Sequence, residues 1–234
     1  PLVNEVRDFL LSEGQLEHLT DLVRVVEKYR SFDAERMDPQ LAKFADSRAL
    51  RRILQSVGKA SEVVPPELIE LLEMVPSEHL DHLMDLLVEE RAAASRRLTR
   101  MLIERFVKEA WDPSSVFERM HRETTGVQCD ILRATSRALP ERVLQEAIQL
   151  RDRPSLDVQM EVLWVLERAT DEALVEETML SMLSSSFAEV RIRVLDFLSD
   201  YGTERVFSAT QGMVEHRSTR GITDRECEAA GRVL

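Results

Sequence analysis

Hydrophobic and polar positions along the chain follow a nine-residue helical pattern that returns at near-regular intervals. The clearest copies begin at Val127, Val158 and Val190, at spacings of 31 and 32 residues. Fainter copies begin at Ala49, Ala94 and Glu226. Positions one, five, six and nine of each copy are almost all apolar, as one buried face of a helix requires. A repeat of this period is typical of stacked helix pairs, so the pattern predicts an all-α fold, an α-solenoid of antiparallel helix pairs.

The apolar positions of the pattern define the expected core. The second helix of each pair is expected to bury Ile53, Leu54, Val57, Leu98, Ile131, Leu132, Val162, Leu163, Leu166, Val194, Leu195 and Leu198. The first helix is expected to cover them with Leu144, Ile148, Leu174, Met179, Leu180, Leu183, Val206, Phe207 and Met213. Full burial of such a side chain stabilises by about 1.5 to 3 kcal/mol, so an extended array can stand without a globular centre.

Prolines, glycines and capping residues mark the helix ends. Helices are expected over residues 3–12 and 16–29, separated at Gly14, and a turn at Pro39 is expected to open a short helix. Further starts or turns are expected at Gly58, Pro65, Pro66, Pro76, Pro113, Pro140, Pro154, Asp171 and Thr203. Residues 1–46 are expected to form a helical N-terminal cap or degenerate repeats, continuous with a repeat array over 47–234.

Composition supports a helical protein and limits its setting. Only seven glycines and 5% aromatic residues occur in 234 residues, and no hairpin or phosphate-loop signal is present. No apolar run has the length of a membrane helix. Cys129 and Cys227 lie far apart within helical segments, which favours reduced thiols and a cytoplasmic location. The chain begins at Pro1 and stops inside an expected helix, which fits a piece of a longer protein.

Charge is distributed unevenly. The formal net charge of -12 disfavours general affinity for nucleic acid or anionic membranes. Residues 65–90 hold eight acidic residues and no Lys or Arg, whereas the next stretch is rich in arginine, including Arg91, Arg96, Arg97, Arg100 and Arg105. Two interpretations stay open: these oppositely charged helices pair with each other, or the basic helix offers an arginine surface to an acidic partner.

The repeat resembles HEAT repeats, in particular the short form found in the phycobilisome-lyase-like branch, where a Val-Arg dipeptide opens the second helix. Val190 and Arg191 match this feature, while the copies at Val127 and Val158 carry Gln at the second position and match in part. The resemblance covers roughly residues 49–234. It is specific for architecture and weak for function, because HEAT-like proteins bind proteins, nucleic acids or cofactors, and a few are enzymes.

The resemblance implies that second helices line a concave groove, with positions three and seven of each copy facing it. The N-terminal half of that groove is then basic, with contributions from Arg51, Arg52 and Arg137, and its middle is apolar, beginning at Cys129. The hypothesis is a partner-binding site in which an apolar cluster anchors a segment and arginines receive its acidic residues: Arg96, Arg97, Arg100, Arg133, Met160, Trp164 and Ile192. The alternative is that Met160 and Trp164 pack into the core.

Signals for catalysis are poor. His79 and His82 have spacing that suits one face of a helix, but no third metal ligand is evident nearby. Ser184 to Ser186 form an expected inter-helix turn without a nucleophile-elbow context, and neither cysteine has a histidine partner in sequence. No catalytic residue, metal or cofactor is therefore expected.

The sequence predicts a non-catalytic scaffold that binds a protein partner, with oligomeric state left open. One alternative is a HEAT-like nucleic-acid-binding protein or DNA glycosylase, a resemblance suggested by Trp111, Asp112 and Trp164. The acidic total and the lack of lysine and aromatic interleaving oppose it. A bilin-lyase-like enzyme is a further alternative that rests on fold analogy alone.

Overall fold

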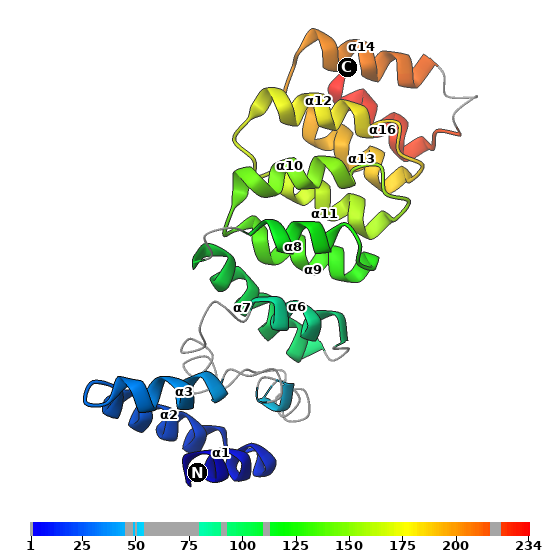
Figure 1. The fold of residues 1–234 in the computed structure, drawn as a ribbon. Coiled ribbons are helices and arrows are strands. Elements are labelled where there is room, and N and C mark those ends of the chain that lie inside the picture. The colour runs from blue at the N-terminus through cyan, green and yellow to red at the C-terminus, as the bar shows by residue number, and fades with distance from the viewer. Residues whose placement is uncertain are drawn as a thin grey trace. The chain divides into compact units, whose positions relative to one another are not determined.

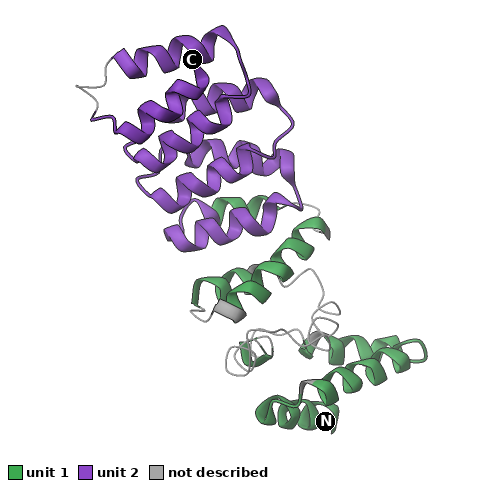
Figure 2. Cartoon of the chain, turned by 180° about the vertical axis from the view of Figure 1, so that it is seen from behind, with its two compact units in different colours: residues 1–119 green, residues 120–234 purple. Residues whose placement is uncertain are grey.

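The described part of the chain is helical. The computed structural model describes residues 2–44, 49, 51–53, 80–89, 93–109, 113–215 and 221–234 (Figure 1). Within these ranges the regular elements are all helices, which confirms the predicted all-α class. None of the described helices is long and apolar enough to cross a membrane. The chain divides into two compact units, residues 1–119 and 120–234 (Figure 2).

Unit 1 begins with three helices that contact one another in every combination. They are α1 (Leu2–Glu13), α2 (Leu16–Arg30) and α3 (Ala34–Phe44). Gly14 separates the first two with a φ of 67°, a left-handed conformation that glycine adopts without steric cost, as the sequence predicts. The guanidinium of Arg7 donates to the carbonyl of Lys43 at 2.9 Å and so ties α1 to the end of α3.

The rest of unit 1 holds α6 (Leu80–Glu89), α7 (Ala93–Glu109) and α8 (Ser114–Met120). The acidic α6 and the arginine-rich α7 pack against each other. Two carboxylates of α6 form ion pairs with arginines elsewhere: Asp85 with Arg119 at 2.7 Å, and Glu89 with Arg51 at 2.6 Å.

Unit 2 arranges its helices in two layers (Figure 1). One layer contains α9 (Thr125–Ser136), α11 (Leu156–Leu166), α13 (Ala188–Leu198) and α16 (Asp224–Val233), each in contact with the next. The other contains α10 (Pro140–Leu150), α12 (Glu172–Met182) and α14 (Glu204–Glu215). Helix α10 packs against α9 and α11, α12 against α11 and α13, and α14 against α16. The copies of the sequence pattern that begin at Val127, Val158, Val190 and Glu226 all fall in the first layer.

The core follows the predicted apolar stripe. Every expected second-helix core residue that the structure describes is buried: Ile53, Leu98, Ile131, Leu132, Val162, Leu163, Leu166, Val194, Leu195 and Leu198. Of the expected covering residues, Leu144, Met179, Leu183, Val206 and Met213 are buried, whereas Ile148, Leu174 and Leu180 are half-buried. Leu54, Val57, Gly58, Pro65, Pro66, Pro76, His79, Trp111 and Asp112 lie outside the described residues.

Helix starts in unit 2 follow the predicted capping residues. The carboxylate of Asp171 accepts from the Leu174 amide at 3.1 Å, and the hydroxyl of Thr203 accepts from the Val206 amide at 3.3 Å. Pro140 occupies the first turn of α10, where its missing N–H leaves no partner unsatisfied. Pro140, Asp171 and Thr203 thus stand at the starts of α10, α12 and α14, the helices of the second layer.

Two expectations from the sequence are wrong. Pro39 does not open a helix; it lies inside α3, which starts earlier because Asp33 accepts from the Arg36 amide at 3.3 Å and caps it. Phe207 does not cover the core and is 39% exposed. The buried positions of α14 are Val206, Thr210 and Met213, so a residue one position after Val206 is rotated about 100° away from that stripe.

Candidate functional site

Trp164 lies on α11 with its side chain between the core and solvent. It is half-buried, so neither full burial in the core nor full exposure on the surface describes it. The guanidinium carbon of Arg168 stands 4.0 Å from the centroid of the indole ring, a cation–π arrangement, and Arg168 also donates to the carbonyl of Trp164 at 2.9 Å. Two contacts to the same residue hold Arg168 against the ring.

A small cavity opens beside the indole ring. Its volume is about 150 Å³. Trp164 and Val165 of α11 line it, together with Arg168, which follows the end of α11. Ser136 and Arg137 at the end of α9 and Pro140 at the start of α10 complete the wall. Because α9, α10 and α11 pack against one another, three helix ends fix its walls. We call this cavity the Trp164 pocket.

Ion pairs connect the helices of the same layer. Arg133 of α9 donates to Glu161 of α11, with Nε to Oε1 at 2.8 Å. Arg193 of α13 binds Glu167, just after α11, through Nε and Nη2 at 2.5 and 2.8 Å. Glu161 and Glu167 are largely buried, with side-chain exposures of 12% and 14%, while the guanidinium-bearing side chains are about half exposed. In this layer, carboxylates of the chain itself therefore form ion pairs with several of the exposed arginines.

The same arrangement continues to the end of the chain. Arg232 of α16 pairs with Asp196 of α13. These are the residues at position seven of their pattern copies, the position that the resemblance to HEAT repeats implies for the groove. Because Arg133, another position-seven residue, has an internal carboxylate partner as well, its charge is already compensated within the chain.

The proposed partner-binding residues divide between the two units. Arg96, Arg97 and Arg100 lie on α7 of unit 1, where Arg97 is exposed and the other two are half-buried. In unit 2, Arg133 is exposed on α9, Met160 and Trp164 are half-buried on α11, and Ile192 is half-buried on α13. Since α11 packs against both α9 and α13, the structure brings these four residues onto consecutive helices of one layer.

Cys129 does not belong to this surface. The sequence places it in the apolar middle of the groove, but it is buried, with 6% exposure. Helix α9 packs against both α10 and α11, and most of its residues are buried, so position three of this copy has no open side. Burial and the carboxylate of Glu161 raise the pKa of the Cys129 thiol to about 11, against an opposing effect of Arg133.

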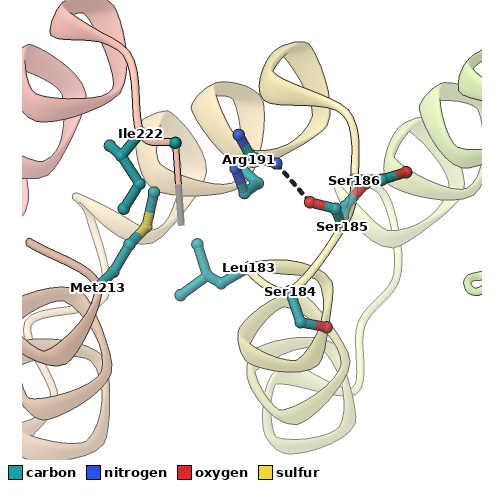
Figure 3. A pocket seen from close by; sticks show the side chains of 8 residues that line it. Leu183, Ser184, Ser185, Ser186, Arg191, Met213 and Ile222 are labelled. Carbon is teal, nitrogen blue, oxygen red and sulfur yellow. Dashed lines mark hydrogen bonds between the residues drawn. The ribbon is translucent and has the colours of Figure 1, made fainter. Parts of the chain in front are cut away.

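A second cavity lies at the turn between α12 and α13 (Figure 3). Its volume is about 390 Å³, and its lining includes Leu183, Ser184, Ser185, Arg191, Met213 and Ile222. The Ser184 to Ser186 segment forms the inter-helix turn that the sequence predicts. Arg191 donates to the Ser185 carbonyl and binds Glu226 at 2.5 Å, so its guanidinium is committed to the fold.

Two features of these sites were missed by sequence reasoning. Arg168 lies four residues after Trp164, a spacing that places two side chains on one helix face. The sequence therefore contains a local indication of this contact. The pairing of Arg191 with Glu226 joins residues 35 positions apart and depends on which helices are neighbours, so no local pattern indicates it. Among the described residues no three His, Cys, Asp or Glu side chains gather in a group that could hold a metal ion.

Comparisons of the chain with protein-family models, with curated proteins and with solved structures gave no match.

Proposed function

We propose that this chain is a HEAT-like α-solenoid that works as a non-catalytic, cytoplasmic protein-interaction module. Its binding surface is the layer formed by α9, α11, α13 and α16, and Trp164 is the anchor. The observation that carries this proposal is the position of Trp164. A half-buried tryptophan that lines a cavity and is braced by an arginine has the character of an interface hot spot, since Trp and Arg are the residues most enriched there.

The arrangement of unit 2 supports the architectural part of the proposal. Four copies of one sequence pattern occupy four neighbouring helices of a single layer, and the intervening helices pack on them from the other layer. Repeat proteins are built in this way because each unit buries its apolar face only against its neighbours. The exposed face of such a layer suits an extended partner segment.

The surroundings of Cys129, Ser184 and Ser185 support a non-catalytic role. The Cys129 thiol is buried and its pKa is raised, so it stays protonated at neutral pH. Ser185 donates to the side-chain oxygen of Gln159 at 2.6 Å, and Ser184 donates to the Ser181 carbonyl at 2.7 Å. An amide or carbonyl oxygen does not act as the general base that activates a serine.

The internal ion pairs favour a protein partner over nucleic acid. Phosphate backbones are bound by arginines and lysines whose charge is available, and affinity rises with the number of phosphates neutralised. Here Arg133, Arg193 and Arg232 are compensated by carboxylates of the chain itself. The arginines of α7, Arg96, Arg97 and Arg100, form a separate proposed contact for acidic residues of the partner.

Affinity capture tests the proposed function. The wild-type chain, Trp164→Ala and an Arg96/Arg97/Arg100→Glu variant are immobilised and exposed to lysate of the source organism, with and without nuclease. We expect a protein that wild type retains despite nuclease treatment and that Trp164→Ala loses. Phe207→Ala, at an exposed aromatic residue of α14, is the matched control and should retain it. Retention of nucleic acid in place of protein would contradict the proposal.

A further inference from the structure

The Trp164 pocket has the dimensions of a site for one side chain. Its volume of about 150 Å³ is close to that of an engineered cavity of about 150 Å³ that accepts a benzene molecule. A side chain of glutamate size therefore fits, whereas a folded partner surface does not enter. The pocket opens between helix ends, so a peptide segment that crosses the layer can place one residue in it.

The lining of this pocket contains two arginines and no carboxylate. Six arginines of unit 2 are paired with carboxylates of the chain: Arg133, Arg142, Arg151, Arg191, Arg193 and Arg232. Arg137 and Arg168 both line the Trp164 pocket, and neither has an ion pair within the part of the chain that the structure describes. In a chain of net charge -12, a cavity lined by two arginines and by no carboxylate suits an anionic group.

The wall of the pocket also fits the apolar part of an acidic side chain. Trp164, Val165 and Pro140 supply apolar surface, while the two guanidiniums supply hydrogen-bond donors. Arg168 is held in place by its stacking on the indole ring and by its bond to the Trp164 carbonyl. A guanidinium that is already ordered loses less side-chain entropy when it binds, which favours a strong charge-assisted hydrogen bond to a carboxylate.

We infer that the Trp164 pocket binds an aspartate or glutamate side chain within an extended segment of a protein partner. Arg137 and Arg168 receive the carboxylate, and Trp164 and Pro140 contact its methylene groups. This inference rests on the proposed function and adds the chemistry of the recognised residue. A nucleic-acid phosphate is disfavoured as the occupant because the acidic chain repels a long polyanion, whereas one carboxylate on a peptide meets only the local charge.

A peptide selection tests the inference on the full chain. A phage-displayed library of random peptides is selected on wild type, and the enriched sequences are synthesised with amidated C-termini and a fluorescent label. Affinities are measured by fluorescence anisotropy for wild type, Arg137→Gln, Arg168→Gln, Trp164→Ala and Arg205→Gln. Arg205 is an exposed arginine of α14 whose replacement removes the same charge without touching the pocket. Circular dichroism melts verify that each variant is folded.

We expect enrichment of peptides that contain Asp or Glu, and loss of affinity on the order of tenfold in Arg137→Gln and in Arg168→Gln, because a hydrogen bond to a charged group is worth about that factor. Arg205→Gln should bind as wild type does. Replacing the enriched acidic residue of the peptide by its amide should weaken binding of wild type but leave that of Arg168→Gln nearly unchanged.

The remaining outcomes separate the inference from the proposed function. Enriched peptides without acidic residues, whose binding is lost in Trp164→Ala alone, would overturn the inference and leave the interaction surface standing. A lack of any enriched peptide would count against both. Binding of labelled duplex or single-stranded DNA that depends on Arg137 and Arg168 and falls steeply with salt would overturn the inference in favour of a phosphate ligand.

Discussion

Arg191 on α13 and Glu226 on α16 form a buried ion pair, with Nε and Oε1 2.5 Å apart and side-chain exposures of 12% and 0%. The same carboxylate accepts from the amide and the hydroxyl of Thr223, both at 2.7 Å, and so completes the capping box that starts α16. One side chain thus both begins the last described helix and joins it to its neighbour.

We expect Glu226→Ala to lower the free energy of unfolding by about 3 kcal/mol, because it leaves a nearly buried guanidinium without its carboxylate and removes a helix cap. Urea unfolding followed by circular dichroism measures the change. Glu228→Ala, two residues away with 78% side-chain exposure, is the matched control and should stay within about 0.5 kcal/mol of wild type. Equal stabilities of the two variants would refute the role assigned to Glu226.

The stability that Glu226 contributes should depend on pH. Burial by itself raises the pKa of this carboxyl, but hydrogen bonds from Arg191 and Thr223 outweigh burial and hold the pKa below its ordinary value of 4.5. A lowered folded-state pKa stabilises the protein above the ordinary pKa, and this contribution is lost as pH falls through the folded-state value.

Comparison of wild type with Glu226→Gln isolates the charge, because glutamine preserves a capping box. The difference between their unfolding free energies should be largest near neutral pH and shrink below about pH 4. A difference that stays constant from neutral to acidic pH would show that ionisation of Glu226 has no part in stability.

The thiol of Cys129 should be inert in the folded protein. It is buried, and burial together with Glu161 raises its pKa to about 11, so the thiolate that reacts with disulfide reagents is scarce at neutral pH. In a Cys227→Ser background, Ellman's reagent should therefore react slowly with the native chain and quickly after addition of urea. Rapid reaction without denaturant would contradict the burial of α9.

The ion pairs between first-layer helices in which the arginine is half exposed should matter much less for stability. Arg193 is half exposed where it binds Glu167, and exposed pairs contribute about 0.2 to 1 kcal/mol. Arg193→Gln should therefore lower the free energy of unfolding by under about 1 kcal/mol, a loss that shrinks as salt concentration rises. A loss as large as that of Glu226→Ala would mean that Glu167 is left buried and uncompensated.

The helices and the core could be predicted from the sequence because their causes are local. The pattern copies starting at Val127, Val158 and Val190 identify α9, α11 and α13 and their buried faces, since apolar spacing and helix geometry share one period. The prediction that Pro39 opens a helix was wrong because the effect of a proline depends on where the helix starts. The capping contact of Asp33 places the start of α3 before Pro39.

The candidate site could be predicted only in part. Helical spacing places Trp164, Met160 and Ile192 on first-layer helices, where each is half-buried, and their role in binding a partner stays a prediction. Cys129 occupies position three of its copy, as Met160 and Ile192 do in theirs, yet it is buried, as are most residues of α9 around it. The internal partners of Arg133 and Arg191 depend on contacts between helices, which periodicity within one helix does not encode.

The affinity and stability of Trp164→Ala, measured on the same preparation, test the central claim most directly. With a captured partner or a selected peptide as probe, the account predicts a loss of affinity on the order of thirtyfold or more, as removal of an interface tryptophan produces. The urea midpoint should shift only modestly, because the indole is half-buried. Unchanged affinity together with a large loss of stability would contradict the account and make Trp164 a core residue.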